Sequence, residues 1–178
     1  AKTVRDVADL YAPVFAEKHI DFRSTGVETP VEAFAPAPYT ESDLEQTFGP
    51  TAHMLDVLTE HLGPFPYPKY AQIAAEGIGG AMENISLVSW DDRFMLDGAL
   101  ATEEQWLVDI INVHEMAHAW FGDHVGCQDH AHAWLKESWA TYVESLWYAW
   151  EHGEDAHLHD LWAHAEVYFR ECDERYQR

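Results

Sequence analysis

Basic residues are scarce in this sequence, which has ten Lys and Arg against 32 Asp and Glu in 178 residues. Proteins bind phosphate backbones through positive charge, so the formal net charge of −22 predicts no nucleic-acid partner. So large a negative charge also repels itself in the folded state unless salt screens it. Two interpretations stay open, a surface adapted to high salt and an ordinary acidic protein.

Cysteines and long apolar runs are scarce as well. Cys127 and Cys172 are too few for a disulfide scaffold, although a single bridge stays possible. No run of about eighteen apolar residues occurs, so we expect no membrane-spanning helix and no membrane partner. The first residues lack the apolar segment of a signal peptide, which favours a cytoplasmic location. Removal of a leader stays open because residue 1 is Ala rather than Met.

The composition is that of a folded domain, with 47% apolar and 13% aromatic residues. We divide the chain into an N-terminal extension over residues 1–50 and a core over residues 51–178. The extension is expected to contain a short helix near residues 3–12 and a strand after Gly26. A proline-rich connection then ends near Thr40.

The first half of the core is predicted to alternate between helix and strand. Apolar spacing indicates a helix over residues 51–62, stopped by Gly63 and Pro64. Short strands are predicted over residues 70–75 and 85–90, on either side of a glycine-rich bend at residues 76–84. This bend is either a plain hairpin loop or a place where a ligand approaches the backbone closely.

The second half of the core is predicted to be helical. A capping-box pattern at Thr102 indicates a helix from Glu103 to about Gly122, with Trp106, Ile110, Val113 and Ala117 on its apolar face. Further helices are expected from about residue 131 to 150 and from about residue 155. The last of these is predicted to turn an apolar face toward a core, formed by Leu158, Leu161, Trp162, Ala165 and Phe169.

A His-Glu-x-x-His pattern at residues 114–118 lies within the first of these helices. His114 and His118 are one turn apart on one face, so both imidazoles can bind one Zn²⁺. Glu137 lies nineteen residues later in the next helix, where apolar neighbours predict a largely buried carboxylate. We predict one Zn²⁺ held by His114, His118 and Glu137, with a fourth position open for water.

Two other glutamates are candidates for roles beside this metal. Glu115 points about 100° round the helix from His114, so we predict that it is the general base for zinc-bound water. Glu144 is either a hydrogen-bond partner of a ligand histidine or an exposed charge. The other histidines toward the C-terminus are interpreted as solvated or core side chains rather than a second metal site: His124, His130, His132, His152, His157, His159 and His164.

The sequence Gly80-Ala81-Met82-Glu83-Asn84, the pattern at residues 114–118 and the later Glu137 together resemble the aminopeptidase N family of gluzincin zinc metallopeptidases. Residues 64–68, 120–123 and 134–144 are similar to that family too. The resemblance covers roughly residues 51–170. It implies an α+β fold, namely a thermolysin-like catalytic domain with a small mixed sheet packed on helices.

The resemblance also implies a zinc-dependent aminopeptidase that hydrolyses the N-terminal bond of a peptide. It implies that Glu83 binds the free α-amine of the substrate, while the backbone of Gly80, Ala81 and Met82 holds the peptide along a strand edge. An acidic group at a fixed distance from the zinc would place the first peptide bond on the metal.

Two alternatives stay open. The tyrosine that stabilises the oxyanion in this family lies further downstream than the chain extends, and none of Tyr142, Tyr148, Tyr168 and Tyr176 matches its context. Loss of one oxyanion donor costs about a hundred- to a thousand-fold in turnover. The chain would then be a zinc-binding core with weak or no activity. An endopeptidase with the same zinc chemistry is the other alternative.

Overall fold

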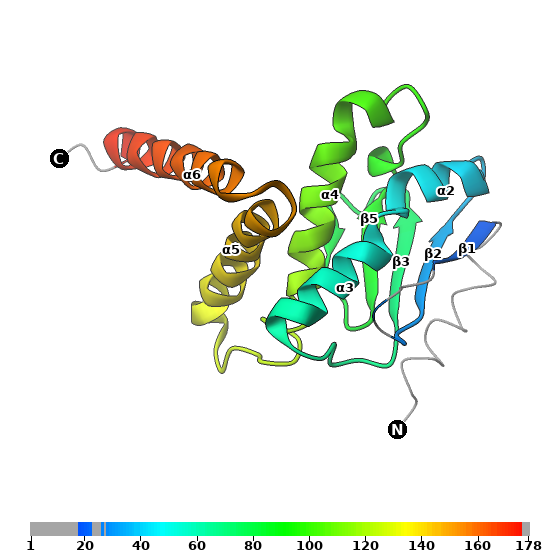
Figure 1. The fold of residues 1–178 in the computed structure, drawn as a ribbon, viewed down its shortest axis with the longest axis horizontal. Coiled ribbons are helices and arrows are strands. Elements are labelled where there is room, and N and C mark those ends of the chain that lie inside the picture. Colours follow the sequence, from blue (N-terminus) through cyan, green and yellow to red (C-terminus); the bar gives the residue numbers. More distant parts are fainter. Residues whose placement is uncertain (1–17, 23–25, 27, 176–178) are drawn as a thin grey trace.

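The structure is a computed structural model that describes residues 18–22, 26 and 28–175 (Figure 1). The helix predicted near residues 3–12 lies outside the described residues. Among the helices that are described, none combines the length and apolarity needed to cross a bilayer. Cys127 and Cys172 are both free thiols, so they do not form the single bridge that the sequence left open.

The described residues form one five-stranded mixed sheet, with strand order β1-β2-β3-β5-β4. The strands are β1 (Lys18–Phe22), β2 (Val31–Ala35), β3 (Tyr70–Ala75), β4 (Ala81–Met82) and β5 (Leu87–Asp91). The pairs β2–β3 and β3–β5 are parallel, whereas the pairs at both edges are antiparallel. The predicted strands at 70–75 and 85–90 are confirmed as β3 and β5, although β5 begins two residues late. Strand β1 is not among the predicted elements.

Two helices precede β3. Helix α2 (Glu41–Phe48) begins with a capping box, in which Thr40 and Asp43 each accept a hydrogen bond from the other's backbone N–H. Helix α2 is not among the predicted elements, because eight residues with two apolar side chains give almost no helical period. Helix α3 (Thr51–Leu62) has the predicted bounds and ends at Gly63, whose φ of 97° favours glycine.

The hydrophobic core crosses the predicted boundary between residues 50 and 51. Val31 of β2 and Leu44 and Phe48 of α2 are buried in the same cluster as Leu55 of α3 and Val113 of the following helix. Helix α2 contacts β1, β2 and the following helix α4 (Ala101–Ala117). The division at residue 50 remains a prediction, and the elements on both sides of it pack together.

Helix α4 (Ala101–Ala117) carries the first part of the candidate site. It begins two residues before Glu103 and ends at Ala117, not at Gly122. The capping-box interpretation of Thr102 is wrong because this residue lies inside the helix. The carboxylate of Asp97 instead accepts hydrogen bonds from the N–H groups of Ala99 (2.9 Å) and Leu100 (3.0 Å) just before the helix.

The predicted apolar face of α4 is largely confirmed. Val113 and Ala117 are buried and Ile110 packs against the core, but Trp106 is exposed, so its predicted place on this face is wrong. A buried polar link fixes the helix further. The Thr51 hydroxyl accepts hydrogen bonds from Gln72 Nε2 at 2.6 Å and from Asn112 Nδ2 at 2.8 Å. This link joins α3, β3 and α4 two residues before His114.

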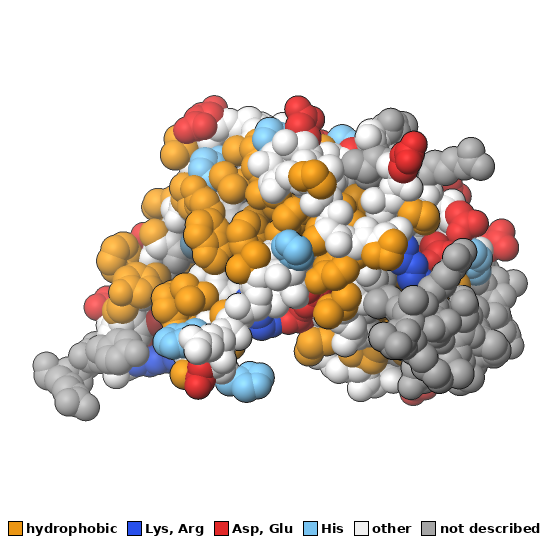
Figure 2. Space-filling model, turned by 90° about the horizontal axis from the view of Figure 1, so that it is seen from below, with side chains coloured by type: hydrophobic (Ala, Val, Ile, Leu, Met, Phe, Trp, Pro, Cys, Tyr) orange, Lys and Arg blue, Asp and Glu red, His pale blue; other side chains and the backbone are white. Residues whose placement is uncertain are grey.

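The predicted C-terminal helices are confirmed as α5 (Ala133–His152) and α6 (Glu154–Arg175), joined at Gly153. The prediction that α6 turns an apolar face toward a core is wrong, because no α6 residue is buried and Trp162 and Phe169 are 61% and 62% exposed. Figure 1 shows α6 projecting away from the sheet and its helices. Figure 2, which views the molecule from below, shows hydrophobic side chains gathered on the surface that faces the reader.

Candidate metal centre

Three side chains converge where α4 ends and α5 begins. His114 lies in the last turn of α4, His118 is the residue that caps it, and Glu137 lies near the start of α5. The two Nε2 atoms are 3.2 Å apart, and Glu137 Oε2 is 3.4 Å from each of them. A tetrahedral Zn²⁺ with bonds of about 2.0–2.2 Å places its ligand atoms about 3.3–3.6 Å apart. The spacing therefore fits three corners of such a tetrahedron.

Hydrogen bonds fix which ring nitrogens face this point. His114 Nδ1 lies 2.5 Å from Glu144 Oε1, and His118 Nδ1 lies 3.0 Å from the carbonyl oxygen of Phe121. Both partners accept, so each Nδ1–H donates and each Nε2 is left with a lone pair. Burial lowers the pKa of His118. For His114 burial also lowers the pKa, but the hydrogen bond and charge of Glu144 raise it more.

Glu137 is more exposed than its neighbours in the sequence predict. Its side chain is 50% exposed, and Trp134 and Trp139 on the same helix are exposed as well. The prediction of a largely buried carboxylate is therefore wrong. Partial burial raises the pKa of Glu137, but the Lys136 ammonium, 2.7 Å from Oε1, and His118 lower it below its usual value. The carboxylate is ionised, as a metal ligand must be.

Glu115 is buried beside these groups. The residue is 8% exposed, and among the described residues its Oε2 has no hydrogen-bond partner. Burial, together with the negative charges of Glu83 and Glu137, raises the pKa of Glu115 to about 7. A carboxyl group with this pKa exchanges its proton near neutral pH, which suits a general base.

Glu83 follows β4 and pairs with the ammonium of Lys136. Burial raises the pKa of Glu83, whereas the Lys136 hydrogen bond lowers it more. Asp123 lies close enough to Glu83 and Lys136 for their charges to act on its carboxyl group. Burial and then the negative charge of Glu83 raise the pKa of Asp123 to about 6. Lys136 and Asp123 are not among the predicted site residues, although a lysine directly before the predicted ligand Glu137 is a signal in the sequence.

The glycine-rich bend is held in place by Asp91 at the end of β5. Gly79 N–H donates to Asp91 Oδ2 at 2.7 Å, and Asp91 N–H donates to the Gly80 carbonyl at 2.7 Å. Hydrogen bonds from Arg93 and from Gly79 lower the pKa of Asp91 to about 2. The bend thereby presents Ala81 and Met82 as β4 at the edge of the sheet, next to α4. Asp91 is not among the predicted site residues.

A second group of potential ligands lies on the opposite edge of the sheet, formed by His19, Asp21 and Glu32. His19 and Asp21 are exposed, and Glu32 already pairs with Lys69 at 3.4 Å. Among the described residues, the group of His114, His118 and Glu137 is thus the better candidate for a structured metal centre.

Two histidines and a glutamate, offered from consecutive helices of a mixed α+β fold, thus form a potential metal centre. The family model described as the peptidase family M1 domain matches residues 47–175. The chain belongs to this family.

Matched relatives are considerably longer than this chain. The aminopeptidase N of Lactobacillus delbrueckii subsp. lactis is 28% identical over 162 residues, which are 84% of this chain and 19% of that protein. Human aminopeptidase N is 35% identical over 86 residues, 47% of this chain and 9% of that protein. The chain thus spans about a fifth or less of the length of these relatives.

Solved structures with a similar fold are described as M1 zinc metallopeptidases. A two-domain M1 zinc metallopeptidase mutant bound to L-tryptophan has a TM-score of 0.61 at 27% identity, over 88% of this chain and 32% of that chain. A mutant M1 zinc metallopeptidase from Deinococcus radiodurans bound to a Tyr-Ser-Ala substrate has a TM-score of 0.57 at 28% identity, with the same coverage. The mixed α+β fold of the family is therefore present here.

Proposed function

We propose that this chain is the catalytic core of a zinc aminopeptidase, which removes the N-terminal residue from peptides. The observation that carries the proposal is the convergence of three acceptor atoms at 3.2–3.4 Å, with Glu115 and Glu83 beside them. A finer inference is that the fold is thermolysin-like. The mixed sheet and the two consecutive helices that bear the candidate ligands support it.

His114, His118 and Glu137 would hold one zinc ion. Glu144 and the Phe121 carbonyl keep the Nδ1 protons of the two histidines in place, so that the Nε2 lone pairs face the metal position. Zinc bound there would supply a Lewis acid that polarises a carbonyl and lowers the pKa of water.

The protein's own groups would then position the peptide and move the protons. Glu83 anchors the α-ammonium of the substrate, and the edge of β4 offers backbone groups to the extended peptide. Glu115 takes the proton from the attacking water and delivers it to the departing amine. This division of labour favours a substrate with a free N-terminus, because the amine fixes which bond reaches the metal.

Metal analysis is the first test of this function. The purified protein should contain one zinc per chain, and Glu137→Ala should lose it while the exposed control Glu104→Ala keeps it. An aminoacyl reporter should be hydrolysed by the zinc protein, and Glu115→Gln should abolish hydrolysis but retain zinc. Equal cleavage of free and N-acetylated peptides would instead point to an endopeptidase.

A second candidate function is a zinc-binding core with weak turnover. The ion pair between Lys136 and Glu83 favours it, because the proposed amine anchor already holds a cation. Stoichiometric zinc without hydrolysis of the reporter would decide for this candidate.

A further inference from the structure

Lys136 places a cation between the two carboxylates that matter most to the proposed function. Its ammonium pairs with Glu83 and also lies 2.7 Å from Glu137 Oε1. Glu137 therefore uses one oxygen for Lys136 and turns the other, Oε2, toward the two histidines. Lys136 thus contacts both the candidate metal ligand and the candidate amine anchor.

The surroundings hold the lysine in this position. A Cβ at Gly122 would lie 3.3 Å from Lys136 Cδ and 3.2 Å from His118 Nδ1, so glycine at this residue lets the lysine stem pass close to the histidine. The side chain is 25% exposed. Asp123 adds a further negative charge nearby. Burial lowers the pKa of Lys136, but pairing with Glu137 and Glu83 raises it more.

An ammonium at Glu83 is chemically the same group that the proposed substrate would bring. The α-ammonium of a peptide and the ε-ammonium of lysine both donate charge-assisted hydrogen bonds to a carboxylate. When both cations lie against Glu83 their like charges repel, so binding of one opposes binding of the other. We infer that Lys136 is an internal competitor for the amine anchor, which an incoming N-terminus must displace from Glu83.

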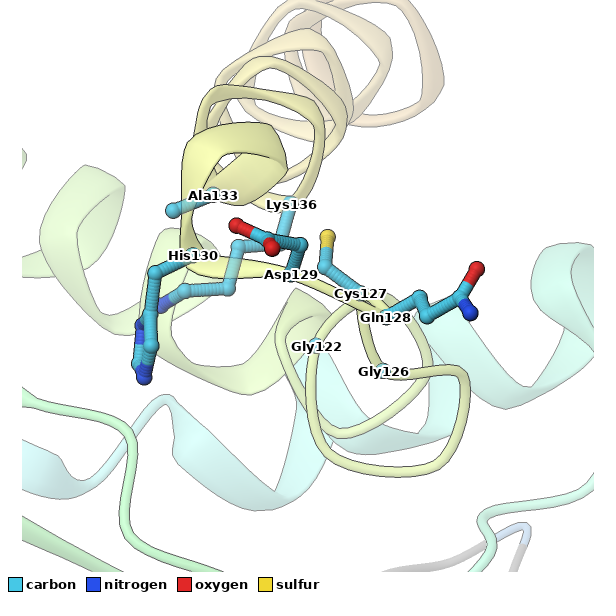
Figure 3. Close-up of a pocket in the computed structure, with 8 residues that line it drawn as sticks. All are labelled: Gly122, Gly126, Cys127, Gln128, Asp129, His130, Ala133 and Lys136. Atoms are coloured by element: carbon cyan, nitrogen blue, oxygen red, sulfur yellow. The ribbon is translucent and has the colours of Figure 1, made fainter.

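Space for the displaced side chain lies next to the site. Lys136 lines a pocket of about 370 Å³ together with Gly122, Asp129, His130 and the intervening loop (Figure 3). Figure 3 shows the lysine side chain extending from α5 along one side of this pocket, with the Asp129 carboxylate on another side. A released ammonium can therefore stay near negative charge, and can keep its contact with Glu137, while Glu83 is given over to the substrate.

The inference rests on the proposed function, and it makes Lys136 a positioning residue that lowers affinity for free amines. The variant Lys136→Met removes the charge but keeps a long stem against Gly122. Lys69→Met is the matched control, because Lys69 also pairs with a glutamate, Glu32, at 3.4 Å and lies away from the metal centre.

Binding of a small amine is the measurement, since it needs no turnover. Tryptophanamide and N-acetyltryptophanamide are titrated into the zinc-loaded proteins by calorimetry. Lys136→Met should bind tryptophanamide about ten-fold more tightly than wild type, which is the scale of one lost charge competitor. Lys69→Met should bind like wild type, and affinity for the N-acetyl compound should be the same in all three. Adding Glu83→Gln to Lys136→Met should remove the gain.

Two other outcomes overturn the inference in distinguishable ways. If wild type prefers tryptophanamide over its N-acetyl form but Lys136→Met binds it equally or more weakly, Lys136 supports Glu83 instead of competing. The proposed function then survives. If neither wild type nor Lys136→Met distinguishes the two compounds, Glu83 is not an amine anchor, and both proposals fail together.

Discussion

Helices α4 and α6 are of similar length, with 17 and 22 residues, yet they are held to the molecule in different ways. Six residues of α4 are buried, among them Val113 and Met116, whereas none of α6 is. Helix α6 packs against α5 without burying any of its own side chains. At this contact the Ser145 hydroxyl donates to Asp160, and His157 Nδ1 meets the Ser145 carbonyl at 2.8 Å. Burial in the core therefore fixes α4, whereas α6 is held mainly through its contact with α5.

The candidate metal centre joins these two kinds of structure. His114 and His118 belong to the densely packed side, where the Thr51 link and the sheet hold α4. Glu137, Glu144 and Lys136 come from α5, which buries Ala140, Val143 and Trp147 in the core but leaves its outer face and its partner helix α6 exposed. A cation bound between His118 and Glu137 would thus tie the thinly packed side to the well-packed one.

The largest expected difference in stability is between substitutions of a buried and an exposed tryptophan. Trp90 of β5 is fully buried against Phe48 and Phe94, whereas Trp162 of α6 is exposed. Trp90→Ala should lower the free energy of unfolding by about 3–5 kcal/mol, because it leaves a cavity in the core. Trp162→Ala should change it by no more than about 0.5 kcal/mol. Urea denaturation of both variants measures the contrast, and similar losses would show that α6 packs as tightly as the sheet.

The buried carboxyl group of Glu115 should lower the free energy of unfolding at neutral pH. Its folded pKa of about 7 lies above the ordinary 4.5, so the folded state holds a proton that the unfolded state releases between these two values. Stability therefore falls as pH rises from about 4.5 to 7, and the cost stays constant above pH 7.

In the metal-free protein, Glu115→Gln should leave stability unchanged at pH 4 and raise it by about 3 kcal/mol at pH 8. Glu104→Gln makes the same substitution at an exposed position of α4 and is the control. Thermal denaturation across this pH range provides the measurement. A gain that does not grow with pH would contradict the buried, proton-holding carboxyl.

Zinc should stabilise the folded protein and have its largest local effect on α5. At a concentration of about 100 times its Kd, a ligand that binds only the folded state stabilises it by about 2.7 kcal/mol. Hydrogen exchange should slow more in α5 than in α4 when zinc is added, because α4 is already fixed by burial. In His118→Ala, zinc should neither stabilise the protein nor slow exchange in α5. In His61→Ala, a substitution in α3, both effects of zinc should remain. Equal slowing of hydrogen exchange in both helices would contradict the prediction that zinc ties α5 to α4.

The smallest expected effect is that of salt. With a net charge of −22, screening by molar NaCl should raise the Tm by a few degrees. The protection of α6 should rise more than that of α4, since several acidic residues of α6 are exposed. A Tm that stays flat from low to molar salt would count against a surface adapted to salt.

The local sequence predicted much of the fold because many elements are specified by short-range physics. The apolar period and the Gly63 stop gave α3 its bounds, and β-forming residues between turns gave β3 and β5. The i, i+4 spacing alone placed the imidazoles of His114 and His118 on one face. Helix α2 escaped prediction because it is too short to show a period, and β1 because pairing with β2 stabilises it rather than its own residues.

Tertiary structure decided the features that depend on contacts between distant segments. The apolar pattern of α6 predicted burial, but the pattern specifies only a face and not a partner to cover it. Tryptophans around Glu137 suggested burial of its carboxylate, while the packing of α5 turned them outward. Lys136 and Asp91 gained their roles only when folding brought Glu83 and Gly79 within hydrogen-bonding distance. The sequence by itself determined which groups could bind a metal, and the fold decided which charges surround them.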